Sequence, residues 1–194
     1  MKPRRSGRGK AHRGNMRNLG LVLSALVAIG SVPAAGAVEY PAGDPQIVEG
    51  MEIAAVYLQA IEMDPPGMML PAVEADIHLE ADIHATADNR NGFAEGDWLP
   101  NLHVEYILIK LDSGEEVAGA LMPMVASDGP HYGDNIKLPG VGNYHLKLVI
   151  QSAPHDIMGF GRHVDKETGV APWPDEFSVD YDFTYAGVGK TGGY

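Results

Sequence analysis

Two histidines and three acidic residues alternate with apolar residues in the segment Asp76–His84. On a β-strand, successive side chains point to opposite faces, so residues two apart stand about 7 Å apart on one side. His78 and Glu80 are therefore predicted to reach one metal ion, with neighbouring strands completing the ligand set. The same pattern is also typical of the solvated outer face of a sheet. His84 lies farther along the strand, and its role stays open.

A second candidate site lies between Met122 and Gly133. A strand is predicted to end in Met122-Pro123-Met124, and a Gly-Pro turn is followed by His131. Thioether and imidazole together suit copper, particularly the cuprous ion, whereas carboxylate and imidazole suit iron and zinc. Met122 is explained equally well as a filler of the core. Met124 and His131 are therefore the candidate ligands here.

The remaining histidines carry weaker signals. His163 lies in the polar segment Gly161–Gly169, whose composition alone favours a solvated loop. His103, His145 and His155 lack a ligand-like context and are expected to be structural or surface groups. The chain has no HExxH motif and no serine in a nucleophile elbow, so we predict no catalytic residues and no enzyme.

The elements that must position these side chains are predicted to be strands, because the hydrophobic period is two almost throughout. Short strands separated by Gly, Pro, Asn and Asp favour an all-β fold built as an antiparallel β-sandwich. Gly142-Asn143-Tyr144 also resembles the tyrosine corner of immunoglobulin-like sandwiches, so we predict an immunoglobulin-like antiparallel β-sandwich. The predicted strands are Ile53–Gln59, Ala75–Ala85, Leu102–Leu111, Glu116–Met122, Tyr144–Ile150 and Phe177–Tyr185.

The N-terminal segment has the order of a secretory signal peptide. A basic region without acids precedes the apolar run Leu19–Ile29, and small residues follow up to Ala37. This mostly apolar run of eleven residues is too short to span a bilayer, although a membrane anchor is the competing interpretation. We therefore predict a signal peptide over residues 1–37, a single β-sandwich metal-binding domain over residues 38–194, and a periplasmic location.

Charge and cysteine content narrow the chemistry further. Removing the leader takes away seven of the 14 Lys and Arg and none of the 26 Asp and Glu, leaving a net charge near −19. Such a chain will not bind nucleic acid through phosphate contacts. This negative charge either attracts cations or simply keeps the protein soluble. Because the chain has no cysteine, any soft metal ligand must be methionine and any nitrogen ligand histidine.

Taken together, these segments resemble a family of periplasmic iron-transport proteins. The family includes the thirty-four-kilodalton membrane antigen and copper-binding partners of Ftr-type iron permeases. The resemblance covers nearly all of the chain after the leader, and no ligand position is missing. It is carried by Ile53–Gln59, Glu74–His84, Asn91-Gly92-Phe93, Met122–Gly133, Gly140–Tyr144 and Arg162–Gly169.

The resemblance implies an immunoglobulin-like homodimer with a copper site near its interface and a link to iron delivery. Carried over, it makes His78, Met124 and His131 the core ligands. It makes Glu80 a nearby carboxylate that ligates iron or a second copper position. It makes His163 a further histidine that reaches the site from the partner subunit. The implied metals are copper and iron, with zinc or manganese as surrogates.

Four functions remain open at this point. The first is a non-catalytic metal-binding protein of high-affinity iron uptake that delivers iron to an inner-membrane permease. The second is a periplasmic copper-binding protein of copper homeostasis. The third is a copper-dependent enzyme that oxidises or reduces iron, and the fourth is a sandwich without a metal role.

Overall fold

The computed structural model describes residues 38–152 and 161–187, so the predicted signal peptide lies outside the described residues. The described residues contain strands, turns and loops and no helix, which confirms the all-β class. The strands, in chain order, are β1 (Tyr40–Pro41), β2 (Gln46–Val48), β3 (Met51–Leu58), β4 (Ile77–Ala85), β5 (Leu102–Lys110), β6 (Glu116–Ala126), β7 (Gly129–Ile136), β8 (Gly142–Ser152) and β9 (Phe177–Tyr185).

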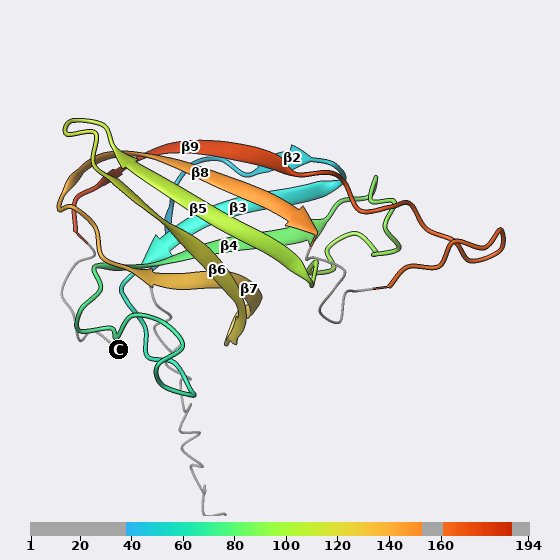
Figure 1. Ribbon diagram of the computed structural model, residues 1–194, viewed down its shortest axis with the longest axis horizontal. Coiled ribbons are helices and arrows are strands. Elements are labelled where there is room, and N and C mark those ends of the chain that lie inside the picture. Colours follow the sequence, from blue (N-terminus) through green and yellow to red (C-terminus); the bar gives the residue numbers. More distant parts are fainter. Residues whose placement is uncertain (1–37, 153–160, 188–194) are drawn as a thin grey trace, which may run out of the picture. The chain divides into compact units, whose positions relative to one another are not determined.

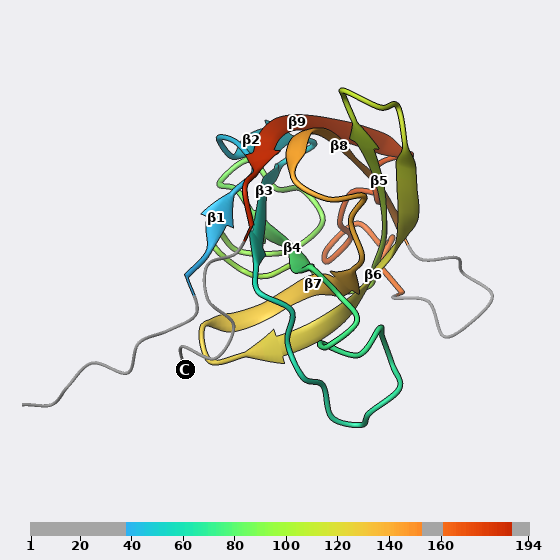
Figure 2. The same ribbon diagram turned by 90° about the vertical axis from the view of Figure 1, so that its left-hand side faces the viewer.

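All pairings are antiparallel, and the strands follow the order β1-β3-β4-β7-β6-β5-β8-β9, with β2 also paired to β3. The long strand β6 joins two halves of this sheet. Its first part, up to Leu121, pairs with β5, and its second part, from Met122, pairs with β7. The sheet therefore curls on itself at β6, as a half-barrel does (Figures 1 and 2).

The inner face of the curled sheet carries the hydrophobic core. In β9, alternate residues from Val179 to Tyr185 are buried and those between are exposed, and β3 and β5 alternate in a similar way. This period-two burial is what the sequence pattern predicts for strands with one wet face. In β4, however, both sides are buried from Ile77 to Ala81, so its polar face is covered as well.

Tyrosines connect the two ends of the curled sheet across the core. The Tyr181 hydroxyl on β9 donates a buried hydrogen bond of 2.8 Å to the Ile53 carbonyl on β3. Tyr57 on β3 packs against Phe183 and Tyr185 on β9, with ring centroids 5.1 and 6.0 Å apart. These contacts hold the β3 half against the β9 half, so β4 and β7 are backed by packed core.

The structure corrects the predicted boundaries where the chain turns through the second candidate site. β6 does not end at Met122 but runs on to Ala126, and Gly129 and Pro130 begin β7 instead of forming the turn. Met124 is consequently paired directly with His131 across the β6–β7 hairpin. Strand β4 begins at Ile77, two residues later than predicted. The Asp76 carboxylate just before it accepts hydrogen bonds from the Lys137 ammonium and the Leu138 N–H.

The contact of Tyr144 is one local feature of the scaffold. The Tyr144 hydroxyl donates to the Gly140 carbonyl at 2.5 Å, which is the backbone contact expected of a tyrosine corner. Whether the curled sheet is an immunoglobulin-like sandwich remains a prediction. Within the described part of the chain, no helix is long and apolar enough to cross a membrane.

Candidate metal centre

Three buried polar side chains converge between β4 and β7. His78 and Glu80 come from β4 and His131 from β7, and one potential ligand atom of each lies within 4.8 Å of the others. The Glu80 Oε1 atom is 3.5 Å from His78 Nε2 and 3.3 Å from His131 Nε2. Their exposed fractions are 1%, 6% and 4%, so the predicted pair on β4 is not part of a solvated sheet face.

Strand register explains how residues distant in the sequence meet here. Glu80 pairs with Gly133 in the β4–β7 ladder, and Gly133 pairs with Met122 in the β6–β7 ladder. A Cβ added to Gly133 would lie 2.6 Å from His78 Nε2 and 3.2 Å from Met124 Sδ. The imidazole and the thioether therefore border the same small space above Gly133, which exists because that residue has no side chain.

The orientation of His78 is fixed from behind by Asn135. The Asn135 amide nitrogen donates to the Ile61 and Leu70 carbonyls, each at 2.8 Å, so its Oδ1 atom faces His78 and the Ile61 amide. That oxygen can only accept, and it lies 3.0 Å from His78 Nδ1. His78 must therefore carry its proton on Nδ1, which leaves a lone pair on Nε2.

Burial lowers the pKa of His78 to about 4, while its hydrogen bond to Asn135 opposes the shift. The imidazole is thus neutral at physiological pH, as a metal ligand must be. Its Nε2 atom is buried and has no hydrogen-bond partner. An unpartnered buried acceptor is unfavourable, and the desolvation penalty is about 1–3 kcal/mol. A cation placed between His78, His131 and Glu80 would satisfy it.

Carboxylates surround Glu80 and make the centre electronegative. The pKa of Glu80 is raised to about 8, mainly by burial and also by the charges of Asp82, Glu39 and Asp128. Burial likewise raises the pKa of Glu39, which hydrogen-bonds Asp128. Because crowded carboxylates disfavour one another's charge, a bound cation would be stabilised here and would displace the proton of Glu80.

The donor set therefore fits a copper or iron ion on its chemistry. Two imidazoles and a thioether suit copper, and the same imidazoles with the Glu80 carboxylate suit iron. The structure brings His78, Glu80 and His131 together, with Met124 bordering the same space.

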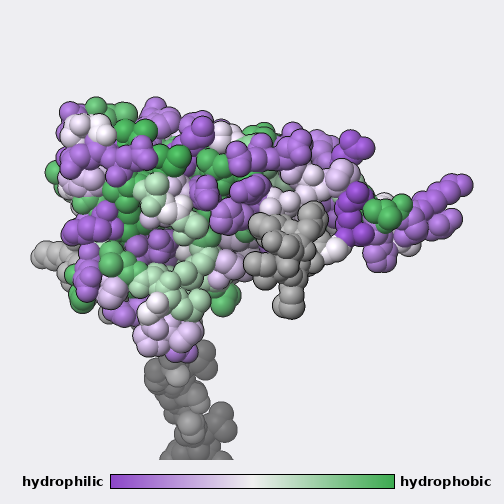
Figure 3. All heavy atoms as spheres, viewed as in Figure 1, coloured by the Kyte–Doolittle hydropathy of each residue, from purple (hydrophilic) through white to green (hydrophobic). Residues whose placement is uncertain are grey.

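The fifth predicted ligand lies elsewhere in this chain. His163 is on the loop between Gly161 and β9, with its side chain 75% exposed, and it is not part of the His78, Glu80 and His131 group. In Figure 1 this loop projects beyond the ends of the strands, and in Figure 3 the projection is mostly hydrophilic. His84 forms an isolated β-bridge with Trp98 and is also outside the group.

Sequence reasoning missed two residues of the centre, Asn135 and Gly133. Nothing in the sequence around Asn135 indicates that it will orient a histidine 57 positions away. Gly133 lies two residues after His131, and its need for a missing side chain becomes visible only through the register of three strands. Sequence reasoning also missed two acidic neighbours: Asp128 lies inside the second candidate segment, whereas Glu39 comes from a segment with no metal-binding pattern of its own.

Comparisons with known proteins show the family of this chain. A family model described as Fe2+ transport protein matches residues 36–187. A UPF0423 protein of Brucella abortus is 56% identical over 182 residues, covering 92% of this chain and all of that protein. The 34 kDa membrane antigen of Treponema pallidum is 36% identical over 166 residues, covering 83% of this chain and 80% of the antigen.

Two solved structures are also similar over nearly their whole length. A copper-bound variant of FetP from uropathogenic Escherichia coli strain F11 superposes with a TM-score of 0.73 at 55% identity, covering 77% of this chain and 99% of FetP. Copper-reconstituted P19 from Campylobacter jejuni gives a TM-score of 0.75 at 55% identity, covering 79% of this chain and 99% of P19. Family model, relatives and structures agree, and the chain belongs to the Fe2+ transport protein family.

Proposed function

We propose that this protein is a periplasmic, non-catalytic metal-binding component of iron uptake that hands iron to an inner-membrane permease. The observation that carries the proposal is the buried, unpartnered Nε2 atom of His78, which faces Glu80 and borders the space beside Met124. A stable fold gains nothing from such an atom unless a ligand occupies the space.

Copper and iron would use different parts of the same centre. His78, His131 and Met124 would hold copper, which supplies one-electron redox chemistry when bound. Iron is the cargo, and the Glu80 carboxylate with the surrounding acids would favour it. The copper-bound forms of FetP and P19 support the copper assignment, and the family's description as Fe2+ transport proteins supports iron.

The complete centre in this proposal needs two subunits. His163 belongs to an exposed loop outside the buried group, so it would complete the site only from a second copy of the chain. We propose a homodimer in which the partner subunit's His163 reaches the ion. The scaffold in this proposal is an immunoglobulin-like sandwich, which the Tyr144 corner supports.

Calorimetric titration of the metal-free protein tests the site. Copper and manganese, as a non-oxidising mimic of ferrous iron, are titrated into the wild type and into Met124→Leu. We expect Met124→Leu to lose tight copper binding and to keep manganese, because the thioether is the soft ligand and the leucine keeps the volume. Failure of the wild type to bind either ion would remove the proposal.

A growth test separates iron uptake from the alternative, copper homeostasis. In a strain lacking the gene, iron starvation should impair growth if the protein serves iron uptake, and copper excess should impair it if the protein protects against copper. Complementation with His78→Gln should fail to restore growth. Repeated turnover of iron oxidation state by the copper-loaded protein would instead indicate an enzyme, and the non-catalytic assignment would be wrong.

A further inference from the structure

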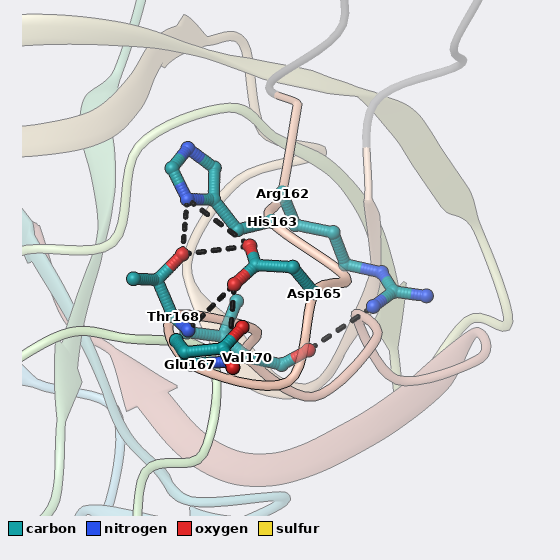
Figure 4. Close-up of polar contacts among 6 residues, drawn as sticks. All are labelled: Arg162, His163, Asp165, Glu167, Thr168 and Val170. Atoms are coloured by element: carbon teal, nitrogen blue, oxygen red, sulfur yellow. Dashed lines mark hydrogen bonds and ion pairs between the residues drawn. The ribbon is translucent and has the colours of Figure 1, made fainter.

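The loop that carries His163 closes on itself through a short hydrogen-bond relay (Figure 4). The Asp165 Oδ1 atom accepts hydrogen bonds from the backbone N–H groups of Glu167 and Thr168, at 3.1 and 2.9 Å. The Gly169 N–H donates to the Asp165 carbonyl at 3.0 Å. The turn therefore fixes the carboxylate of Asp165 and the side chain of Thr168 without needing any contact from His163.

The position of each proton in the relay follows from donor and acceptor inventory. The Thr168 hydroxyl has one proton and donates it to Asp165 Oδ2 at 2.7 Å. The same Oγ1 atom lies 2.7 Å from His163 Nδ1, so towards the imidazole it can only accept. His163 must therefore carry a proton on Nδ1. In the neutral ring, the lone pair is then on Nε2, which points away from the relay.

The stem of the loop is attached to the body of the domain. Val170 donates its backbone N–H to the His163 carbonyl at 3.1 Å, and Arg162 Nη1 donates to the Val170 carbonyl at 3.0 Å. The next residue, Ala171, donates its N–H to the Arg90 carbonyl at 2.9 Å. The imidazole is thus exposed, but the backbone on either side of it is held.

The same polarity is found at the buried centre. His78 is held through Nδ1 by the Asn135 oxygen and presents Nε2 to the metal space. An Asp-x-x-Thr turn would form with any residue at position 163, so the turn alone does not explain a ring nitrogen 2.7 Å from a hydroxyl whose proton is already committed. A histidine ligand whose second nitrogen donates to a carboxylate or another fixed acceptor is the usual arrangement in metal sites.

We propose that Asp165 and Thr168 are positioning residues that hold His163 in the Nδ1–H tautomer and present its Nε2 atom as a ligand to a metal bound by another subunit. The inference rests on the proposed function, because this chain's own buried group does not include His163. It adds that the loop is built for ligation before any ion arrives, since carboxylate, hydroxyl and imidazole are connected within one subunit.

Nitrogen-15 NMR of the metal-free full-length mature protein tests the relay without a metal. Long-range correlations between ring protons and nitrogens, measured above the pKa of the imidazole, report the tautomer of His163. We expect Nδ1–H in the wild type and in Thr168→Ser, which keeps the hydroxyl. We expect Thr168→Val, which has the same shape without a hydroxyl, to move towards the Nε2–H form. An Nε2–H tautomer in the wild type would overturn the relay.

Copper affinity, measured by competition with a chelator, tests the consequence. Removal of a residue that orients a ligand typically lowers metal affinity about 10–100-fold, so we expect a loss of this size in Thr168→Val. The copper affinity of Thr168→Ser should stay within about threefold of the wild-type value. His163→Ala sets the loss for the ligand itself. If Thr168→Val binds copper as tightly as the wild type while His163→Ala binds it more weakly, the positioning role is overturned. Wild-type affinity in His163→Ala would overturn ligation by His163, and the tautomer measured without metal would show whether the relay exists regardless.

Discussion

The same short pattern, a histidine followed two residues later by a glutamate, occurs on two strands of this molecule with different results. His78 and Glu80 on β4 lie 3.5 Å apart, with side chains only 1% and 8% exposed. His103 and Glu105 on β5 lie 3.0 Å apart and hydrogen-bond each other, with side chains 39% and 50% exposed. The exposed pair is satisfied by its own hydrogen bond, whereas the buried pair leaves His78 Nε2 without a hydrogen-bond partner.

Neighbouring strands create this difference. Glu80 is opposite Gly133, which leaves room, and the same neighbouring strand, β7, supplies His131 as a third donor. Glu105 is opposite Ala120 and Val149, which offer no ligand atom. A spacing of two residues therefore places two donors on one face, but a metal site also requires what the adjoining strands bring and how much water they exclude.

The largest effect should come from replacing the histidine of the buried pair. His78→Gln removes a buried donor, and we expect copper affinity to fall by more than the 10–100-fold that is typical of losing only a supporting residue. His103→Gln is the matched control and should bind copper as the wild type does. Competition with a chelator measures both. Equal losses in the two variants would show that burial does not distinguish the pairs.

The glutamates of the two pairs should differ in their effect on the stability of the metal-free protein. The pKa of Glu80 is raised to about 8 in the folded protein, so the folded state holds more protons than the unfolded state from about pH 4.5 to 8, and stability falls as the pH rises through that range. Glu80→Gln abolishes this loss and should stabilise the protein by about 4 kcal/mol at pH 8 and by only about 1 kcal/mol at pH 5.

The contribution of His78 has the opposite sign, since its pKa is lowered to about 4 and stability therefore rises with pH between about 4 and 6.5. It is present in both proteins and cancels when wild type and Glu80→Gln are compared. Urea unfolding at the two pH values provides the measurement. The control, Glu105→Gln, should change stability by less than about 0.5 kcal/mol at both, as surface substitutions usually do. A pH-independent effect of Glu80→Gln would contradict the buried carboxyl.

How much of this could be read from the sequence differs between the fold and the centre. Strict alternation predicted the strand Phe177–Tyr185 without error and placed β5 and β8 to within a few residues, because burial on one face imposes a period of two. The short strands β1 and β2 were not predicted, since two or three residues carry no period. The longer strand β7 was not predicted either, because its buried residues do not alternate regularly with exposed ones.

For the centre, the residue types indicated the candidate ligands, but the sequence did not indicate which residues would lie next to them in the sheet. The sequence singled out His78, Glu80, Met124 and His131, yet it left a solvated face as an alternative for the first two. Only the structure shows that this face is buried and that His131 from the adjacent strand β7 joins it. The contribution of Gly133 depends on a third strand, and no local pattern specifies which residues will be opposite one another across two ladders.

Filling the space beside His78 without removing any ligand should have an intermediate effect. A Cβ on Gly133 would be 2.6 and 2.9 Å from two atoms of the His78 ring, so Gly133→Ala must displace the imidazole or Met124. We expect about a tenfold loss of copper affinity. Gly161→Ala is the control, because a Cβ there meets nothing within 4 Å. Unchanged affinity in Gly133→Ala would mean that the ion does not occupy this space.

The smallest effect concerns a histidine that also meets carboxylates but lies on the surface. His145 on β8 contacts Asp182 at 2.7 Å through Nδ1 and Asp180 at 3.1 Å through Nε2, and the hydrogen bond to Asp182 is the main cause of its raised pKa. Both nitrogens are directed at carboxylates, so these contacts favour the cationic ring, whereas burial favours the neutral ring of His78.

Because the folded pKa of His145 is raised, its contribution to stability is complete below pH 6.5 and is lost as the pH rises through the folded value. The side chains of His145 and Asp182 are 33% and 74% exposed, so solvent and salt limit the contribution to less than about 1 kcal/mol. NMR titration should give a pKa above 6.5 that falls in Asp182→Asn and in high salt, with copper stoichiometry unchanged. A pKa at or below 6.5 would contradict the pairing, and loss of a copper ion in Asp182→Asn would show that surface carboxylates and a histidine suffice for a site without burial.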